Sequence, residues 1–251
     1  MEKNDRPVAL VTGGATGVGR ACVLQFAKRG WDVIINFSRS AREAEETAAA
    51  ARELDSRALV FKADVADDAQ VGQMFEAIAG EFGRLDALVN NAAMTYFIPS
   101  DDLEQMTSEK WDRILDVNLK GAFFCSRAAT PLLRQASSGG SIVNVTSTAG
   151  KDGVGSCVAY AASKGALNTM TKTLARALSP DIRVNAVLPG PIDSRWILEG
   201  DNDWDLAKMT ARDPIPRASQ PEDIADAILF LSIDASMVTG HLMAVDGGRT
   251  M

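Results

Sequence analysis

The chain has few of the residues from which metal sites and disulfide frameworks are built. Among 251 residues there are three cysteines and one histidine. Cys22, Cys125 and Cys157 are widely separated and have no CxxC spacing, so we expect buried or partly buried thiols rather than disulfides or a zinc site. A single histidine, His241, gives little support to a Ser/His/Asp triad. The scattered acidic residues form no metal motif, and no metal requirement is predicted.

Long apolar runs and excess positive charge are also missing. No segment reaches the ~18 uninterrupted apolar residues of a membrane span, and MEKNDRPVAL does not resemble a secretion signal. The sequence therefore predicts a cytoplasmic protein. The formal net charge of -7 disfavours sequence-independent binding to nucleic acid and docking on an anionic membrane.

What the chain does have is a regular alternation of short apolar runs and helical patterns. With 46% hydrophobic and 24% charged residues it resembles an ordinary globular protein with a full core. The runs are continuous, as in strands buried on both faces, which predicts a doubly wound α/β Rossmann fold with helices on both faces of a seven-stranded parallel sheet. The expected strands are PVALVTGG, DVIINFS, RALVFKAD, LDALVNNA, SIVNVTS, IRVNAVLPG and HLMAVDGG.

The helical patterns cover about residues 17–29, 40–54, 67–82, 108–135, 157–178 and 221–231. No linker or internal repeat divides the chain, so residues 1–251 are predicted to form one dinucleotide-binding domain. The segment at about 191–216 is less regular, and we interpret it as a lid over a site.

The first expected strand leads into a glycine-rich turn, TGGATGVG, that precedes a helix. Such a turn lets the backbone approach a pyrophosphate at the positive end of a helix. Its spacing, GxxxGxG, differs from the GxGxxG of the common dinucleotide fingerprint, and a merely tight turn is the alternative. The expected contacts are Gly13, Thr16, Gly17, Val18 and Gly19.

The second expected strand ends in Asn36, Phe37, Ser38 and Arg39, with no acidic residue to hold the 2′-hydroxyl of NAD(H). Ser38 and Arg39 are able to contact a 2′-phosphate through charge-assisted hydrogen bonds, which favours NADP(H). NAD(H) stays possible, because Arg39 is otherwise read as a solvated residue at the start of the next helix.

Two further strand ends carry candidate contacts, since ligands of open α/β sheets bind beyond the carboxyl ends of the strands. Asp64, followed by Val65, is placed to meet an adenine edge, and Asn91 precedes the small Ala92, which leaves room for a ribose. The alternative is that the Asn pair simply caps and turns the chain.

In the pentapeptide YAASK, Tyr160 and Lys164 are four residues apart and project from one face of a helix. An ammonium beside a phenol favours the phenolate, so we expect Lys164 to lower the pKa of Tyr160.

The motifs TGGATGVG, NNAA, Asn118, Ser147, YAASK and PGPIDS, in this order, resemble those of the short-chain dehydrogenase/reductase family over essentially the whole chain. The most similar branch is the 3-oxoacyl-(acyl-carrier-protein) reductase type, with related sugar or polyol dehydrogenases. The resemblance implies a catalytic set of Asn118, Ser147, Tyr160 and Lys164. In that set Tyr160 is the acid/base, Ser147 hydrogen-bonds the reacting oxygen, and Asn118 holds a water near Lys164.

The same resemblance extends to PGPIDS, in which Pro189 and Gly190 shape a turn. There the backbone of Ile192 is expected to bind the nicotinamide carboxamide, and Ser194 the phosphates. One departure from the family pattern is Ala93 in NNAA, where glycine is commoner. Its methyl group narrows the expected pocket floor.

The predicted function is an NADP(H)-dependent oxidoreductase that moves a hydride between nicotinamide and a carbonyl or secondary alcohol. The alternatives are an NAD-dependent sugar or polyol dehydrogenase and, from another class, a non-catalytic NADP-binding sensor or scaffold. The resemblance also implies a homo-oligomer, often a tetramer, built on the helices at 108–135 and 157–178 and on the C-terminal strand.

The substrate is less defined by the sequence. The expected lid is acidic, with Glu199, Asp201, Asp203 and Asp205, which argues against docking of an acidic carrier protein. Trp196, Trp204 and Met209 are read either as an apolar wall for a small neutral substrate or as core.

Overall fold

The structure is a computed structural model that describes residues 6–198 and 203–251. Glu199 and Asp201 of the acidic segment lie outside the described residues. All seven expected strands are present and form one parallel sheet in the order β3-β2-β1-β4-β5-β6-β7. The strands are β1 Val8–Val11, β2 Asp32–Phe37, β3 Ala58–Lys62, β4 Ala87–Asn90, β5 Gly140–Val145, β6 Ile182–Pro189 and β7 Leu242–Val245. The predicted fold class is therefore confirmed.

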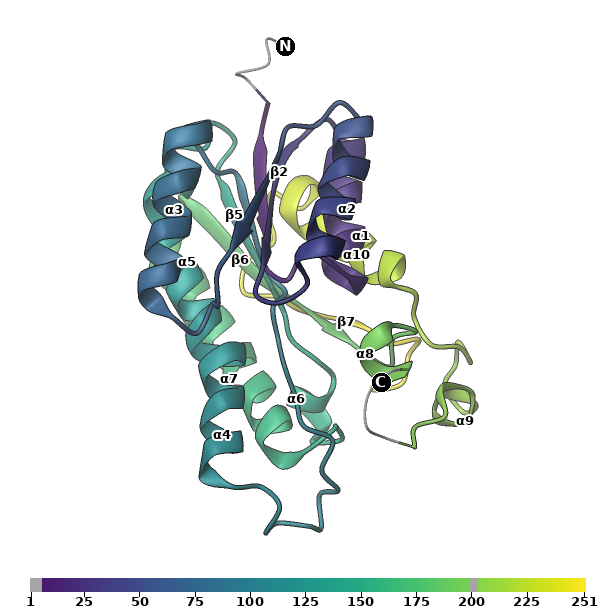
Figure 1. The fold of residues 1–251 in the computed structure, drawn as a ribbon. Helices are drawn as coiled ribbons and strands as arrows, with labels where there is room; N and C mark the ends of the chain where they lie inside the picture. The colour runs from purple at the N-terminus through teal and green to yellow at the C-terminus, as the bar shows by residue number, and fades with distance from the viewer. Residues whose placement is uncertain (1–5, 199–202) are drawn as a thin grey trace.

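Helices cover both faces of this sheet (Figure 1). One layer holds α1 (Gly17–Lys28), α2 (Ala41–Glu53) and α10 (Pro221–Leu229), and the opposite layer holds α3 (Asp68–Phe82), α5 (Ala122–Leu133) and α7 (Val158–Leu178). A separate apolar cluster fills the space between the sheet and each layer. Every residue of β1, β2, β4 and β5 is buried, which explains why their apolar runs are continuous instead of alternating.

The helix expected at 108–135 is interrupted. It consists of α4 (Ser108–Leu115), a π-helical turn at Asp116–Gly121, and α5. A π-helical turn inserts one residue into the helical repeat and is common at functional sites, and this one contains Asn118. A second π-helical turn, Phe230–Asp234, extends α10. No apolar periodicity marks such a turn, so the sequence pattern did not predict either one.

Three short helices lie outside the expected helical patterns: α6 (Ala149–Asp152), α8 (Arg195–Leu198) and α9 (Leu206–Thr210). The last two fall in the segment that the sequence marks as irregular. Among residues 6–198 and 203–251, no helix is long and apolar enough to cross a membrane.

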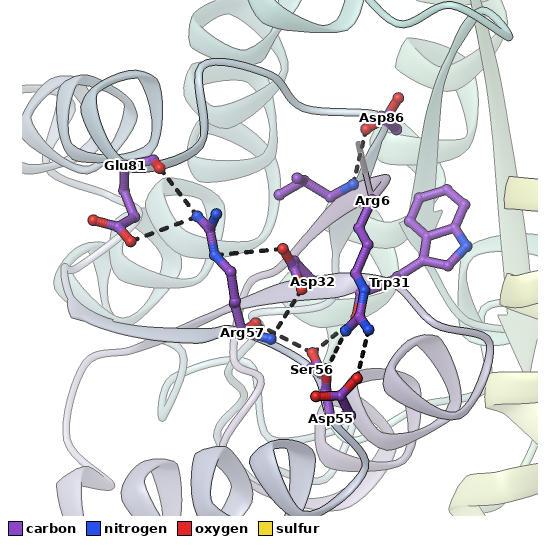
Figure 2. Close-up of polar contacts among 9 residues, drawn as sticks. Arg6, Trp31, Asp32, Asp55, Ser56, Arg57, Glu81 and Asp86 are labelled. Atoms are coloured by element: carbon purple, nitrogen blue, oxygen red, sulfur yellow. Dashed lines mark hydrogen bonds and ion pairs between the residues drawn. The ribbon is translucent and has the colours of Figure 1, made fainter. Parts of the chain in front are cut away.

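The edge of the sheet at which the strands begin, here called the amino edge, carries a group of ion pairs and hydrogen bonds (Figure 2). The side chains of Asp32 and Asp86 are each 2% exposed. Asp86 accepts hydrogen bonds from the backbone of Val8 at 2.8 Å and from the Arg84 guanidinium at 2.7 and 3.0 Å. Asp32 accepts one from the backbone of Arg57 at 2.9 Å. These contacts tie the start of β1 to that of β4 and the start of β2 to that of β3.

Candidate active site

The opposite edge of the sheet, at which the strands end and which is called the carboxyl edge below, opens into a cavity of about 1240 Å³. This exceeds the roughly 300–1,000 Å³ of pockets that hold one drug-sized ligand, so there is room for a dinucleotide and a substrate together. Most of the residues predicted from sequence line it: Gly13, Thr16, Gly17, Val18, Ser38, Arg39, Asp64, Val65, Asn91, Ala92, Ser147, Tyr160, Lys164, Pro189, Gly190, Ile192 and Ser194. Gly19 and Asn118 do not line the cavity and lie behind its wall.

The glycine turn has the shape that close approach of a phosphate requires. Gly13 and Gly17 have φ of +61° and +53°, a region that side chains with a Cβ disfavour. Gly19 acts by packing, since a Cβ there would lie 2.1 Å from the carbonyl oxygen of Gly13. The residues of this turn therefore fit a pyrophosphate at the N-terminus of α1.

Asn91, which follows the neighbouring strand β4, supports this glycine turn. Its side-chain amide donates to the carbonyl oxygens of Thr12 at 2.9 Å and of Gly13 at 3.1 Å. The Thr12 hydroxyl in turn accepts from the backbone N–H groups of Asn91 and Ala92, each at 3.0 Å. Asn91 thus lines the cavity but directs its amide hydrogens into the protein, so these contacts are structural.

At the end of β2, Ser38 and Arg39 are exposed at the cavity rim. The carboxylate at the end of β3 is already engaged, because Asp64 accepts from the backbone of Ala66 at 3.0 Å and pairs with Arg113 at 2.6 Å. The end of β2 carries no acidic side chain beside Arg39. The candidate acid at the end of β3, Asp64, forms an ion pair with Arg113.

The first turn of α7 brings the predicted acid/base residues together. Cys157 is the N-cap residue, and its sulfur accepts a hydrogen bond from the backbone of Tyr160 at 3.4 Å. Lys164 is 2% exposed, and its Nζ lies 5.6 Å from the centre of the Tyr160 ring. Ser147, just beyond β5, hydrogen-bonds the Tyr160 side chain. The serine, the phenol and the ammonium therefore meet in one wall of the cavity.

The electrostatics of this cluster differ from the sequence-based expectation. Burial raises the pKa of Tyr160 to about 12, and the hydrogen bond from Ser147 offsets only part of that rise. Burial also lowers the pKa of Lys164 to about 7. The Lys164 Nζ donates to the Val145 carbonyl oxygen at 2.9 Å. Desolvation thus outweighs the attraction between phenolate and ammonium, and the phenol keeps its proton at neutral pH.

Asn118 contributes from behind the cavity wall. Its amide donates to the Met94 carbonyl oxygen at 3.0 Å and to the Ser163 hydroxyl at 3.1 Å, while its side-chain oxygen accepts from the Met94 backbone at 2.8 Å. These bonds join the segment after β4 to α7. Because both amide hydrogens are used within the protein, the predicted water would have to donate to the side-chain oxygen or bind the main chain of the π-helical turn.

One wall of the cavity is formed by aromatic and methionine side chains, among them Trp196, Trp204 and Met209; it is called the substrate end below because the sequence-based hypothesis places a substrate there. All three line the cavity, together with Met94 and Tyr96. The Trp196 ring lies 6.3 Å from that of Tyr160, and Trp204 meets Phe97 edge-on at 5.3 Å. Trp196 and Trp204 are 40% and 38% exposed, so they are wall residues rather than core.

Besides Arg113, which pairs with Asp64, sequence reasoning missed two further arginines in the cavity lining. Arg195 of α8 pairs with Glu43 of α2 at 3.1 Å, across 152 positions of sequence. Arg249, near the C-terminus, contacts the end of α9. No local pattern marks either residue. All three cysteines are buried and free, as expected. Among the described residues, no group of three or more His, Cys, Asp or Glu side chains is arranged to hold a metal ion.

Comparisons with known proteins agree with this geometry. The family model for enoyl-(acyl carrier protein) reductase matches residues 13–250. The chain is 40% identical to a protein named as ketoacyl reductase 2 of the granaticin polyketide synthase from Streptomyces violaceoruber, over 97% of this chain and 96% of the relative. It is 38% identical to the 3-oxoacyl-[acyl-carrier-protein] reductase FabG of Staphylococcus aureus, over 97% and 98% of the two chains.

A crystal structure described as a short-chain dehydrogenase/reductase from Burkholderia xenovorans superimposes with a TM-score of 0.91 at 40% identity, covering 97% of this chain and 98% of that one. A doubly wound sheet with a glycine turn and a Ser, Tyr and Lys cluster at its carboxyl edge defines an oxidoreductase. This chain belongs to the short-chain dehydrogenase/reductase family.

Proposed function

We propose that the protein is an NADPH-dependent carbonyl reductase in which Tyr160 is the general acid. The observation that carries this proposal is the convergence of Ser147, Tyr160 and Lys164 in one cavity with the glycine turn. A nicotinamide coenzyme, when bound, supplies the hydride that reaches the carbonyl carbon. The residues described here account for the proton and for the orientation of the reacting groups.

Tyr160 donates its proton to the carbonyl oxygen, so that the product is a secondary alcohol. Its pKa, raised to about 12 by burial, keeps the phenol protonated at neutral pH, which is the state that reduction needs. The Ser147 hydroxyl holds the reacting oxygen beside the phenol. Lys164, with a pKa lowered to about 7, is able to exchange a proton near neutral pH and so to return one to Tyr160.

The preference for NADPH rests on the rim at the end of β2. Ser38 and Arg39 are exposed there, and Arg39 offers a planar donor for the 2′-phosphate. The carboxylate of Asp64, which would repel a phosphate, is paired with Arg113. The backbone of Ile192 and the side chain of Ser194 are proposed to hold the carboxamide and the phosphates.

We also propose that the segment at 191–216 is the substrate lid. Its base is closed by a bridge between Ile192 and Ser219 and by a hydrogen bond from the Asp193 backbone to the Ser219 carbonyl oxygen at 2.8 Å. Both of its sides contribute aromatic or sulfur-containing side chains to the cavity, through Trp196 and Met209. This wall favours a small neutral carbonyl compound over a charged one.

A homo-oligomer is part of the same proposal. Phe123 of α5 and Val158 of α7 are 40% and 41% exposed on the helices where the family resemblance puts the subunit contact. Light scattering tests this directly, because a monomer mass would contradict it.

The experiment that tests the function is a paired titration with NADPH and NADH, followed by energy transfer from tryptophan to the bound nicotinamide. Tighter binding of NADPH supports the proposal, and a screen of neutral ketones then follows. Tighter binding of NADH favours an alcohol-oxidising dehydrogenase instead. Tight coenzyme binding without turnover of any ketone, aldehyde or alcohol would indicate a sensor or scaffold.

A further inference from the structure

The residues after β7 fold into a turn that faces the cavity. The carboxylate of Asp246 accepts from the backbone of Gly248 at 2.9 Å and from the backbone and hydroxyl of Thr250 at 3.0 and 2.7 Å. From α6, Lys151 donates to the Thr250 carbonyl oxygen at 2.7 Å. The turn between these contacts directs Arg249 into the cavity lining.

Arg249 holds the C-terminal end of α9. One guanidinium nitrogen donates to the Met209 carbonyl oxygen at 2.7 Å and lies 3.2 and 3.3 Å from the two carboxylate oxygens of Asp213. The side chains of Arg249 and Asp213 are only 24% and 9% exposed. Loss of one partner from such an ion pair leaves a charge largely out of water, so the contact is hard to break.

The wall formed by α9 is thus fixed at two ends. Trp204, just before the helix, packs edge-on against Phe97 from the segment after β4. Met209, near the end of the helix, is held through its carbonyl oxygen by Arg249. The side chains of both Trp204 and Met209 line the substrate end of the cavity. The position of α9 therefore decides how wide that end is.

We propose that Arg249 is a specificity-determining positioning residue, which anchors α9 so that Trp204 and Met209 form a fixed wall against a flat, neutral ring ketone. This inference rests on the proposed carbonyl reduction. Arg249 is not the anchor for an anionic substrate, because Asp213 already neutralises its charge. Its effect is exerted through the shape of the pocket, and it does not touch the coenzyme end.

The test compares Arg249→Met and Asp213→Asn with wild type. Arg217→Met is the matched control, because Arg217 makes an exposed ion pair with Asp223 at 2.6 Å and does not line the cavity. The probes are cyclohexanone and its larger benzo-fused analogue 2-tetralone, at saturating NADPH. In wild type the fixed wall should contact the fused ring of 2-tetralone and so favour this ketone. A displaced wall would lose that contact, so we expect the preference for 2-tetralone, as a ratio of kcat/KM values, to fall about tenfold in both test variants, through KM.

Two measurements distinguish displacement of the α9 wall from a general loss of structure. The NADPH dissociation constant should stay unchanged, and acrylamide quenching of tryptophan in the coenzyme-free protein should increase. That increase should disappear when Trp204 is replaced by Phe. Arg249→Lys, which keeps the charge, should retain most of the preference and provides the test if Arg249→Met does not fold.

An unchanged ketone preference in Arg249→Met and Asp213→Asn would overturn the inference, as would a loss confined to kcat. A parallel weakening of NADPH binding would overturn it as well. If wild-type protein binds no coenzyme and reduces neither ketone, the proposed function fails instead. The quenching measurement still decides in that case whether Arg249 holds the wall.

Discussion

The two edges of the same sheet are built on opposite principles. At the amino edge, the buried Asp32 is matched by Arg57 and by a backbone N–H group (Figure 2), and the buried Asp86 is matched by Arg84 and by the backbone N–H of Val8. At the carboxyl edge the strands end around a cavity, and the buried cation Lys164 faces a backbone carbonyl group rather than an acid. The polar side chains at the amino edge hold strands together, whereas several of those at the carboxyl edge face the cavity.

This difference predicts whether a mutation at each edge should change stability or catalysis. A paired charge at the amino edge contributes to stability, because removing one partner leaves the other buried and unmatched. At the carboxyl edge Asn91 and Asn118 are also structural, but the Tyr160 hydroxyl contributes mainly to chemistry, and its removal should leave the fold intact. Each of the following experiments probes this division, starting with the largest expected effect.

Replacing Tyr160 by Phe removes the proposed proton donor and leaves its ring in place. General acid catalysis typically contributes about 10²- to 10⁴-fold, so kcat for ketone reduction should fall by that factor. The urea midpoint of unfolding should change little, because only the hydrogen bond with Ser147 is lost. Turnover close to that of wild type would refute the assignment of the acid.

Replacing Asp86 by Asn should lower the stability of the fold and leave catalysis unchanged. The variant leaves the Arg84 guanidinium beside a neutral amide, and a loss of about 3 kcal/mol in the free energy of unfolding is expected. Asp55→Asn is the control, because Asp55 also pairs with an arginine, Arg6, but its side chain is 74% exposed. Urea unfolding measures both variants, and kcat per folded molecule should stay at the wild-type value. A change in kcat without a change in stability would undermine the division between edges.

Lys164 is the exception that sharpens the comparison, since it is a charge buried at the functional edge. Its pKa is about 7 in the folded state, below the ordinary lysine value of about 10.4. Below pH 7 it is charged in both the folded and the unfolded state, and folding then bears the full cost of burying the charge. As pH rises from 7 toward the unfolded pKa, the folded state holds the neutral amine and this cost decreases.

The substitution Lys164→Met removes this cost. It should therefore stabilise the fold more at pH 6 than at pH 9, by about 3 kcal/mol, as measured by urea unfolding at the two pH values. A pH-independent difference would show that the lysine is not desolvated. Catalysis offers a second readout, because kcat/KM for reduction should decline in wild type as Lys164 loses its proton above pH 7.

Coenzyme choice is expected to depend on a residue at the rim. Arg39→Ala should weaken NADPH binding about tenfold, the lower range for a charge-assisted hydrogen bond, and leave NADH binding within about twofold. Arg42→Ala is the matched control, because Arg42 is exposed on α2 and pairs with Glu46 at 3.7 Å. Equal losses for both coenzymes would mean that Arg39 does not recognise the 2′-phosphate.

The sequence predicted the sheet and the placement of Tyr160 and Lys164 at one cavity, for a physical reason. Strands buried on both faces need continuous apolar runs, and Tyr160 and Lys164 are joined by one helical turn, so both signals are local. The π-helical turn around Asn118, by contrast, accompanies bonds to Met94 and Ser163 from other segments. Arg249 and the pair of Arg195 with Glu43 depend on contacts that exist only after folding.

That last pair yields the smallest expected effect. Arg195 and Glu43 join α8 to α2, and Arg195 lines the coenzyme cavity, so the pair should act as a strap that slows coenzyme release. Its side chains are 46% and 25% exposed, and such pairs contribute up to about 1 kcal/mol. Glu43→Gln should therefore speed dissociation of NADPH and of NADH alike, by up to about fivefold, in stopped-flow displacement.

The control for the strap is Glu46→Gln on the same helix, whose partner Arg42 is 82% exposed. If Glu43 acted instead by repelling the 2′-phosphate, Glu43→Gln would remove that repulsion. It would then slow the release of NADPH and leave the release of NADH unchanged. The sign of the change for NADPH, read beside that for NADH, therefore separates the two. Recovery in the charge-swapped pair Glu43→Arg with Arg195→Glu would show that the contact itself, rather than either charge, holds the functional edge closed.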